Sequence, residues 1–348
     1  MRCFVSRLFP ALFLPCVLAV LLPAAPFCGA QTHYHIVERW TIGGQGGWDY
    51  LRADGPAHRL YVTHNSRVEA IDTRTGKVVG AVTGLKGTHG VALDPDGRTG
   101  YITDGGGDAI VVFDRRNLSP LAVVPAGGNP DGVAYEPATR TVWVFNGRSR
   151  DASVLDAPSR TIIDTVPLPG KPEFPAAGRD GQMFVNIQDK NEILRIDART
   201  HAIQATWPLQ GCESPTGLAY DPVGQRLFTV CYGGKMNVLD AQTGRVIATP
   251  SIGAGPDAAR YDVRRRLAFS SNGGSGTLTV IDAGKPSYPV AQSLATEQGA
   301  RTMALDETTG RIYLATAKFG ARPAATPAMP QPRPSIVPGS FEILVVAP

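Results

Sequence analysis

Charge, cysteine and long apolar runs are all scarce in this sequence. Charged residues make up 18% of the 348 residues and the formal net charge is only +4, so neither a disordered polyelectrolyte nor a strongly basic nucleic-acid-binding protein is expected. Hydrophobic residues reach 43%, which is enough for a substantial core. Glycine (39) and proline (29) are abundant, which favours many turns between short elements.

Several catalytic signatures are missing. The chain has no Cys-x-x-Cys-His for haem attachment, no His-Glu-x-x-His zinc helix and no phosphate loop ending in Gly-Lys-Ser/Thr. "NGGSGT" is not a nucleophile elbow, and "GGQGGW" does not join a strand to a helix as a dinucleotide-binding loop does. No cofactor is therefore expected, although binding of a divalent cation is left as an alternative.

The first thirty residues have the pattern of a secretory signal peptide. Arg2 and Arg7 precede an apolar run over residues 8–22, no acidic residue is present, and small residues lead to Ala30. We expect cleavage near Ala30 and a periplasmic or secreted mature chain, residues 31–348, with no membrane span. Three prolines interrupt the run and disfavour a signal anchor, and a phenylalanine before the nearest cysteine disfavours a lipoprotein signal. Removing the two arginines lowers the charge from +4 to +2.

Only two of the five cysteines, Cys212 and Cys231, follow the predicted cleavage site. In an oxidising compartment such a pair readily forms a disulfide. The alternative is two free or buried thiols, and two thiolates alone make a poor metal site.

The mature chain repeats itself with a period of 41 to 43 residues. An aspartate follows an apolar run in six copies, at Asp72, Asp114, Asp156, Asp197, Asp240 and Asp282. A period in the forties indicates repeated supersecondary units. We expect these aspartates to be structural, because their side chains can accept hydrogen bonds from the backbone of the turn that follows.

Each copy contains four short runs rich in Val, Ile, Leu, Tyr and Phe, separated by Gly, Pro and Asp. In the second copy they are "GVALD", "GYIT", "AIVVFD" and "LAVVPA". Four antiparallel strands in about 42 residues are typical of a β-propeller blade. The sequence therefore predicts an all-β protein, a seven-bladed propeller in a single domain over residues 31–348.

The seventh copy stops after its third strand, "FEILVVA". The stretch "HYHIVERWTI", residues 33–42, has the right character to supply the missing fourth strand from the other end of the chain. We expect it to close the ring, which leaves no unpaired interior edge.

The segment "LYVTHNSRVEAIDTRTGKVVGAV", followed by "HGVALDPDG", resembles the YVTN repeat of the YncE-like seven-bladed propellers. The resemblance covers nearly all of the mature chain and implies an exported or cell-surface protein. Copies four and six depart from it, at "EFPAAGRDG" and "DAARYDVRRR", so no ligand-facing position is carried over there.

Propeller ligands bind at the mouth of the central channel, where first strands begin and second strands end. The first strands are predicted to begin at Asp49, His89, Asp131, Glu173, Thr216, Asp257 and Arg301. The residues at the ends of the second strands are His64, Asp104, Asn146, Gln188, Tyr232, Asn272 and Lys318. We take as ligand-binding candidates Trp48, Asp49, His64, His89, Asp131, Glu173, Tyr232, Asp257, Arg301 and Lys318.

Four carboxylates around one axis repel each other unless protons, cations or a metal neutralise them. The metal hypothesis assigns Asp49, Glu173 and Asp257 as ligands. The alternative is that each acid bonds its own loop, and that His64 and His89 are solvated loop residues.

Two other segments are distinctive. A proline-rich insert at residues 320–340 is expected to hang over the mouth as a lid, a docking segment or a solvent loop. Arg260 and Arg264–Arg266 are expected in a hairpin of the opposite face, as a solvated edge.

From these features we expect a monomeric binding or scaffold protein for a small ligand or a periplasmic protein at the mouth. Nucleic-acid binding is disfavoured. The alternative is a metal-dependent hydrolase similar to the propeller lactonases. A quinoprotein dehydrogenase is a more distant alternative, because no residue marks a quinone site.

Overall fold

The computed structural model describes residues 33–348 except 327, 328, 330, 331 and 333. The predicted signal peptide, residues 1–30, lies outside the described residues. In the part that is described, no helix has the length and apolarity needed to cross a bilayer.

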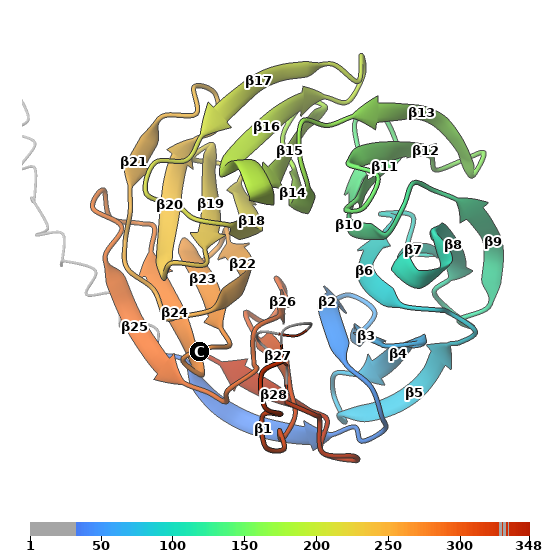
Figure 1. The fold of residues 1–348 in the computed structure, drawn as a ribbon, viewed down its shortest axis with the longest axis vertical. Helices are drawn as coiled ribbons and strands as arrows, with labels where there is room; N and C mark the ends of the chain where they lie inside the picture. Colours follow the sequence, from blue (N-terminus) through green and yellow to red (C-terminus); the bar gives the residue numbers. More distant parts are fainter. Residues whose placement is uncertain (1–32, 327–328, 330–331, 333) are drawn as a thin grey trace, which may run out of the picture. The chain divides into compact units, whose positions relative to one another are not determined.

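Seven four-stranded antiparallel sheets surround one axis in chain order (Figure 1). Blades one to three comprise β2 Trp48–Asp54, β3 Arg59–His64, β4 Arg67–Asp72 and β5 Lys77–Val82; β6 Thr88–Leu93, β7 Thr99–Asp104, β8 Ala109–Asp114 and β9 Pro120–Pro125; β10 Pro130–Glu136, β11 Thr141–Asn146, β12 Asp151–Asp156 and β13 Thr161–Pro167. The short 3-10 helix η1, Gly105–Gly107, follows β7.

Blades four to six comprise β14 Pro172–Ala177, β15 Gln182–Ile187, β16 Glu192–Asp197 and β17 Ile203–Pro208; β18 Pro215–Asp221, β19 Arg226–Cys231, β20 Lys235–Asp240 and β21 Val246–Ala248; β22 Pro256–Asp262, β23 Leu267–Asn272, β24 Thr277–Asp282 and β25 Val290–Ala295. A second 3-10 helix, η2 Gln188–Lys190, follows β15. The prediction of an all-β seven-bladed propeller is confirmed.

Blade seven is closed by the N-terminal strand, as predicted. It comprises β26 Met303–Leu305, β27 Ile312–Thr316, β28 Glu342–Ala347 and, on its outer edge, β1 His35–Thr41. The antiparallel register of β1 on β28 runs from His35 opposite Ala347 to Thr41 opposite Glu342. Tyr34 and Trp40 are buried beside this strand pair, so closure adds apolar burial to the backbone hydrogen bonds.

The core lies between the faces of neighbouring blades. One apolar cluster, for example, packs Trp48, Leu51 and Leu60 of blade one against Tyr313 and Ile343 of blade seven. A single blade cannot bury both faces, which explains physically why the chain repeats.

The repeated aspartates close the turns between third and fourth strands. Asp72, for example, accepts a 2.8 Å hydrogen bond from the backbone N–H of Arg74, and Asp197 accepts one of 2.8 Å from Arg199. The structural role predicted for this series is confirmed.

A β-bulge begins the first strand of blades one to six. In each, the pairing register shifts after the first residue of the strand, as between Trp48 and Leu51 of β2. The second residue is thereby left out of the regular ladder, and a bulge re-aims its side chain. These second residues are Asp49, His89, Asp131, Glu173, Thr216 and Asp257, and they gather at one end of the channel.

Candidate functional site at the channel mouth

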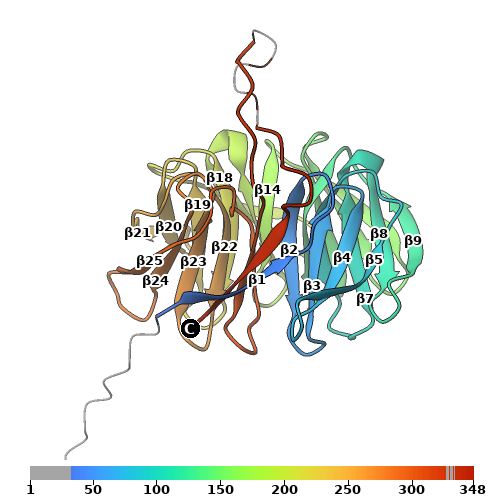
Figure 2. The same cartoon turned by 90° about the horizontal axis from the view of Figure 1, so that it is seen from below.

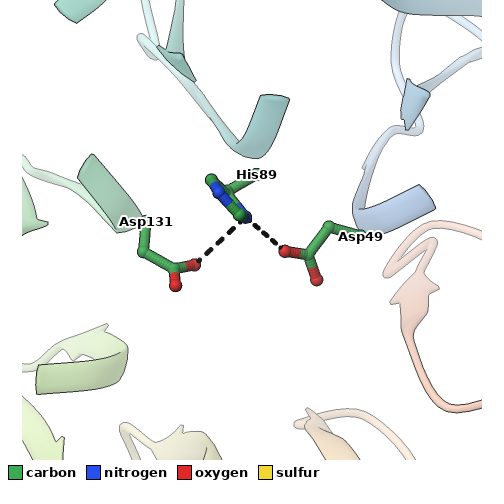
Figure 3. A group of neighbouring side chains, drawn as sticks. All are labelled: Asp49, His89 and Asp131. Carbon is green, nitrogen blue, oxygen red and sulfur yellow. Dashed lines mark hydrogen bonds and ion pairs between the residues drawn. The ribbon is translucent and has the colours of Figure 1, made fainter. Parts of the chain in front are cut away.

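Three consecutive blades bring Asp49, His89 and Asp131 together at the mouth (Figure 3). His89 Nδ1 lies 2.6 Å from Asp49 Oδ2 and 3.8 Å from Asp131 Oδ1. We call these three residues the axial cluster. One ligand atom from each lies within 4.8 Å of the others, and they are the sole such group of metal-ligating side chains among the described residues.

Glycine makes room for the imidazole. A Cβ at Gly105 of η1 would lie 2.5 Å from Cδ2 and 2.6 Å from Nε2 of His89. Any other residue there would push the ring away, so the backbone of blade two positions Nδ1 toward the two carboxylates.

The electrostatics of the axial cluster favour protonation. Burial acts to lower the pKa of His89, but the hydrogen bond with Asp49 and the charges of Asp131, Asp49 and Glu173 outweigh it and raise that pKa to about 9. Burial and the charge of Asp49 raise the pKa of Asp131 to about 8, against the charge of His89. At neutral pH the cluster therefore holds protons that the free side chains would release.

The other two carboxylates have cationic partners of their own. Lys171 Nζ lies 2.7 Å from Glu173 Oε1, and Arg301 Nε lies 2.8 Å from Asp257 Oδ2. Burial raises the pKa of Asp257 to about 7 although the charge of Arg301 opposes the shift, and burial likewise raises the pKa of Glu173 against Lys171. The mouth is thus a partly neutralised charge network.

The metal trio predicted from the sequence does not meet. Asp49, Glu173 and Asp257 belong to blades one, four and six, and no group of that composition converges among the described residues. The trio was wrong because the three carboxylates start from blades that are not neighbours, whereas Asp49, His89 and Asp131 start from three consecutive blades. Lys171, which the sequence reasoning missed, stands just before the start of β14 and next to a proline.

His64 does not open onto the mouth, contrary to expectation. It is fully buried, its ring packs against that of Phe341 with centroids 4.4 Å apart and a tilt of 45°, and its Nδ1 lies 3.3 Å from Glu69 Oε2. As the last residue of β3 it faces the space between blades one and seven.

A cavity of about 430 Å³ opens at the mouth beside the charge network. We call it the mouth cavity. Its walls include Trp48, Arg301, Phe319, Arg322, Pro334 and Ile336, with backbone from four glycines. Trp48 is 5% exposed and lies 6.1 Å from the Phe319 ring, while the Arg301 guanidinium lies 5.8 Å from the Trp48 ring.

The proline-rich insert provides one wall of the mouth cavity. Its base is an ordered ribbon in which Gly320 donates to the carbonyl of Ser335 at 2.8 Å and Val337 donates to that of Lys318 at 2.8 Å. The described part of the insert stands out from the mouth face (Figure 2). Gly299 lets the Phe319 ring approach the backbone closely, because a Cβ at Gly299 would lie 2.5 Å from the phenylalanine ring.

The remaining candidates lie around the rim. Tyr232 is 67% exposed and outside the mouth cavity, and Lys318 is exposed at the base of the insert. Cys212 and Cys231 are joined by a disulfide beside the start of β18.

No model of a protein family matches the chain, and no curated protein matches it either. Solved structures do. Hydrazine synthase of Kuenenia stuttgartiensis matches with a TM-score of 0.70 at 15% identity, over 78% of this chain and 92% of that one. The structure of U3-55K matches with a TM-score of 0.74 at 8% identity, over 89% of this chain and 98% of that one. The WD40 repeats of RRP9 match with a TM-score of 0.74 at 8% identity, over 90% of this chain and 97% of that one. These likenesses establish the seven-bladed propeller fold and assign no family.

Proposed function

We propose that the protein is an exported binding propeller that holds a small ligand at the channel mouth, one with an apolar body and an anionic group. The mouth cavity is the observation that carries this proposal. Trp48, Phe319 and Ile336 offer apolar and aromatic surface, while Arg301 and Arg322 offer guanidinium groups that recognise carboxylate or phosphate.

Arg322 is the cation best placed to serve a ligand. Arg301 already donates to Asp257 at 2.8 Å and to the carbonyl of Trp48 at 3.1 Å. Arg322 is exposed and forms no ion pair within 4.0 Å with a carboxylate of the described residues. An anionic group entering the cavity would therefore gain a partner without breaking a bond of the protein.

Export is part of the proposal. The leader pattern and the repeat's resemblance to the YVTN propellers support it, and the disulfide suits an oxidising compartment.

The probe 8-anilinonaphthalene-1-sulfonate tests the proposal, because it combines aromatic rings with one anionic group. We expect saturable binding at a single site, weakened about tenfold by Phe319→Ala and by Arg322→Gln. Tyr232→Ala is the matched control, since it removes an exposed aromatic ring of the same face outside the cavity. Equal binding by all four proteins would refute the proposed site.

The second candidate is a metal-dependent hydrolase, and the axial cluster is the observation that favours it. Two carboxylates and one imidazole fit Mn²⁺ or Zn²⁺, and such an ion would polarise a substrate carbonyl or activate water. A ligating imidazole must be neutral, so an ion would have to displace the proton that His89 retains. For this reason we rank the hydrolase second.

Melting of the chelated protein, with calcium, magnesium, manganese and zinc added back separately, separates the two functions. A metal bound by the folded state raises the melting temperature. The hydrolase requires a rise with one metal that His89→Gln abolishes and Asp108→Asn, an acid outside the axial cluster, leaves intact. Absence of any such rise removes the hydrolase and leaves the binding function standing.

A further inference from the structure

A second cavity, of about 360 Å³, occupies the central channel away from the mouth. We call it the channel cavity. The first strands of all seven blades line it, and Pro95, Pro137 and Glu307, from the hairpins that follow first strands, line its far end. It therefore faces the side of the propeller opposite the mouth.

An aromatic pair lines the end of the channel cavity nearest the mouth, where Tyr50 follows Asp49 and Phe174 follows Glu173 in the chain. The rings of Tyr50 and Phe174 meet edge to face at 4.8 Å, and Tyr50 is 6% exposed. Burial, and then the charges of the mouth carboxylates, raise the pKa of Tyr50 well above its usual value. The ring of the same residue lines the channel cavity.

Two guanidinium groups lie on the channel-cavity side of this aromatic pair. The guanidinium of Arg260 covers the Phe174 ring at 4.7 Å, and Arg52 lines the same cavity. This corrects the sequence-based placement of Arg260 on a solvated hairpin. Arg260 lies within β22, and the alternation of side chains along the strand turns it into the channel, while Arg264 remains in the hairpin.

Neither guanidinium is neutralised by a neighbour. Arg52 and Arg260 form no ion pair within 4.0 Å with any carboxylate of the described residues, and the guanidinium of Arg260 donates to the backbone carbonyl of Ala259 at 2.7 Å. Burial and then the charge of Arg52 lower the pKa of Arg260 to about 10. The two like charges line the same cavity, with Arg260 half-buried and Arg52 exposed.

One acid faces both arginines. Glu307 lines the channel cavity and acts on each guanidinium through its charge, without a contact pair. The tyrosines that complete the walls, Tyr135, Tyr220 and Tyr261, are neutral hydrogen-bond donors at physiological pH. Two cations, one acid and several hydroxyl groups leave a net positive site.

We propose that the channel cavity binds a small oxyanion, of the carboxylate or phosphate class, between Arg52 and Arg260. Planar guanidinium groups bind such anions through paired N–H donors. Phe174 holds Arg260 in place, so less side-chain entropy is lost when the anion binds. This site is distinct from the mouth cavity and independent of its function.

Calorimetric titration of the mature protein with inorganic phosphate, and separately with succinate, tests the proposal in a low-salt buffer. We expect saturable binding of at least one probe, weakened about tenfold or more by Arg52→Gln and by Arg260→Gln. Which probe binds more tightly distinguishes phosphate from carboxylate. Arg264→Gln removes the same charge from an exposed hairpin position and should bind like the wild type.

Glu307→Gln provides a test that loss of folding cannot mimic, because it removes the competing acid and should tighten binding several-fold. Arg260→Lys keeps the charge but loses the planar fork, and should bind more weakly than wild type. No saturable binding at millimolar probe, or equal binding by Arg52→Gln, Arg260→Gln and wild type, overturns the proposal. Anilinonaphthalene sulfonate binding at the mouth should be unchanged in all these variants, so the proposals for the two cavities are tested independently.

Discussion

Replacing Asp131 with asparagine tests the charge balance of the mouth most directly. Asp131 has a side chain only 14% exposed, and its nearest cationic group, His89 Nδ1, is 3.8 Å away. Burial and the charge of Asp49 raise its pKa to about 8. The folded protein therefore keeps a proton that the unfolded chain releases near pH 4.

The sign of the effect follows from proton linkage. Between about pH 4 and pH 8 the folded state binds more protons than the unfolded state, so the free energy of unfolding falls as pH rises. Over about four pH units, at about 1.4 kcal/mol each, the titration of Asp131 with rising pH can lower the free energy of unfolding by at most about 6 kcal/mol. His89 and Asp257 have raised pKa values as well, so they change stability in the same direction.

Asparagine keeps the shape of the side chain without its charge. We expect little change in stability at pH 5, where Asp131 is protonated, and a gain of about 1–2 kcal/mol at pH 9. The gain stays below the upper limit because the network relaxes and because His89 loses one of the charges that hold its proton.

Urea unfolding of both proteins at pH 5, 7 and 9, with a chelator present, measures the difference. Asp108→Asn is the matched control, because a backbone hydrogen bond from Asn129 lowers the pKa of Asp108, and removing its charge should destabilise at high pH. A difference between Asp131→Asn and wild type that does not change with pH, or a loss of stability at pH 9, would refute the reasoning.

Three further predictions concern the scaffold. Deleting residues 33–41 should lower the melting temperature sharply or cause aggregation, because β28 becomes an open edge; an unchanged melting curve contradicts the closure. Cys212→Ser with Cys231→Ser should cost about 3 kcal/mol in urea unfolding, since the disulfide closes a loop with a sequence separation of 19; equal midpoints with and without reductant would count against it. Asp54→Ala should cost about 3 kcal/mol, because it leaves the buried Arg115 without its carboxylate; a change below about 0.5 kcal/mol would show that the pair is not buried in solution.

The period of the sequence predicted the architecture because the strands and turns of each blade are specified by residues within a single copy of the repeat. The seven predicted first-strand starts, spaced by the repeat, set the number of blades, and the four short apolar runs in each copy set the four strands. Closure by β1 was also predictable, since a seventh copy with three strands needs a fourth.

The same period identified which residues lie at the mouth, but it could not predict which of their side chains contact each other. The bulges at the start of β2, β6 and β10 decide that Asp49, His89 and Asp131 turn inward, and the order of the blades decides that these three are neighbours. Glu173 and Asp257 occupy equivalent positions in the repeat, yet they bond to Lys171 and Arg301 instead.

The sequence by itself thus determined the blade count, the strand order, the turns and the residues that begin each first strand, because hydrophobic periodicity and turn chemistry act within a few residues. Only the tertiary structure decided which charges meet, why His64 is buried and why Arg260 enters the channel. Those outcomes depend on distances around the ring and on the direction of each side chain. Both arise only when all seven blades have packed together.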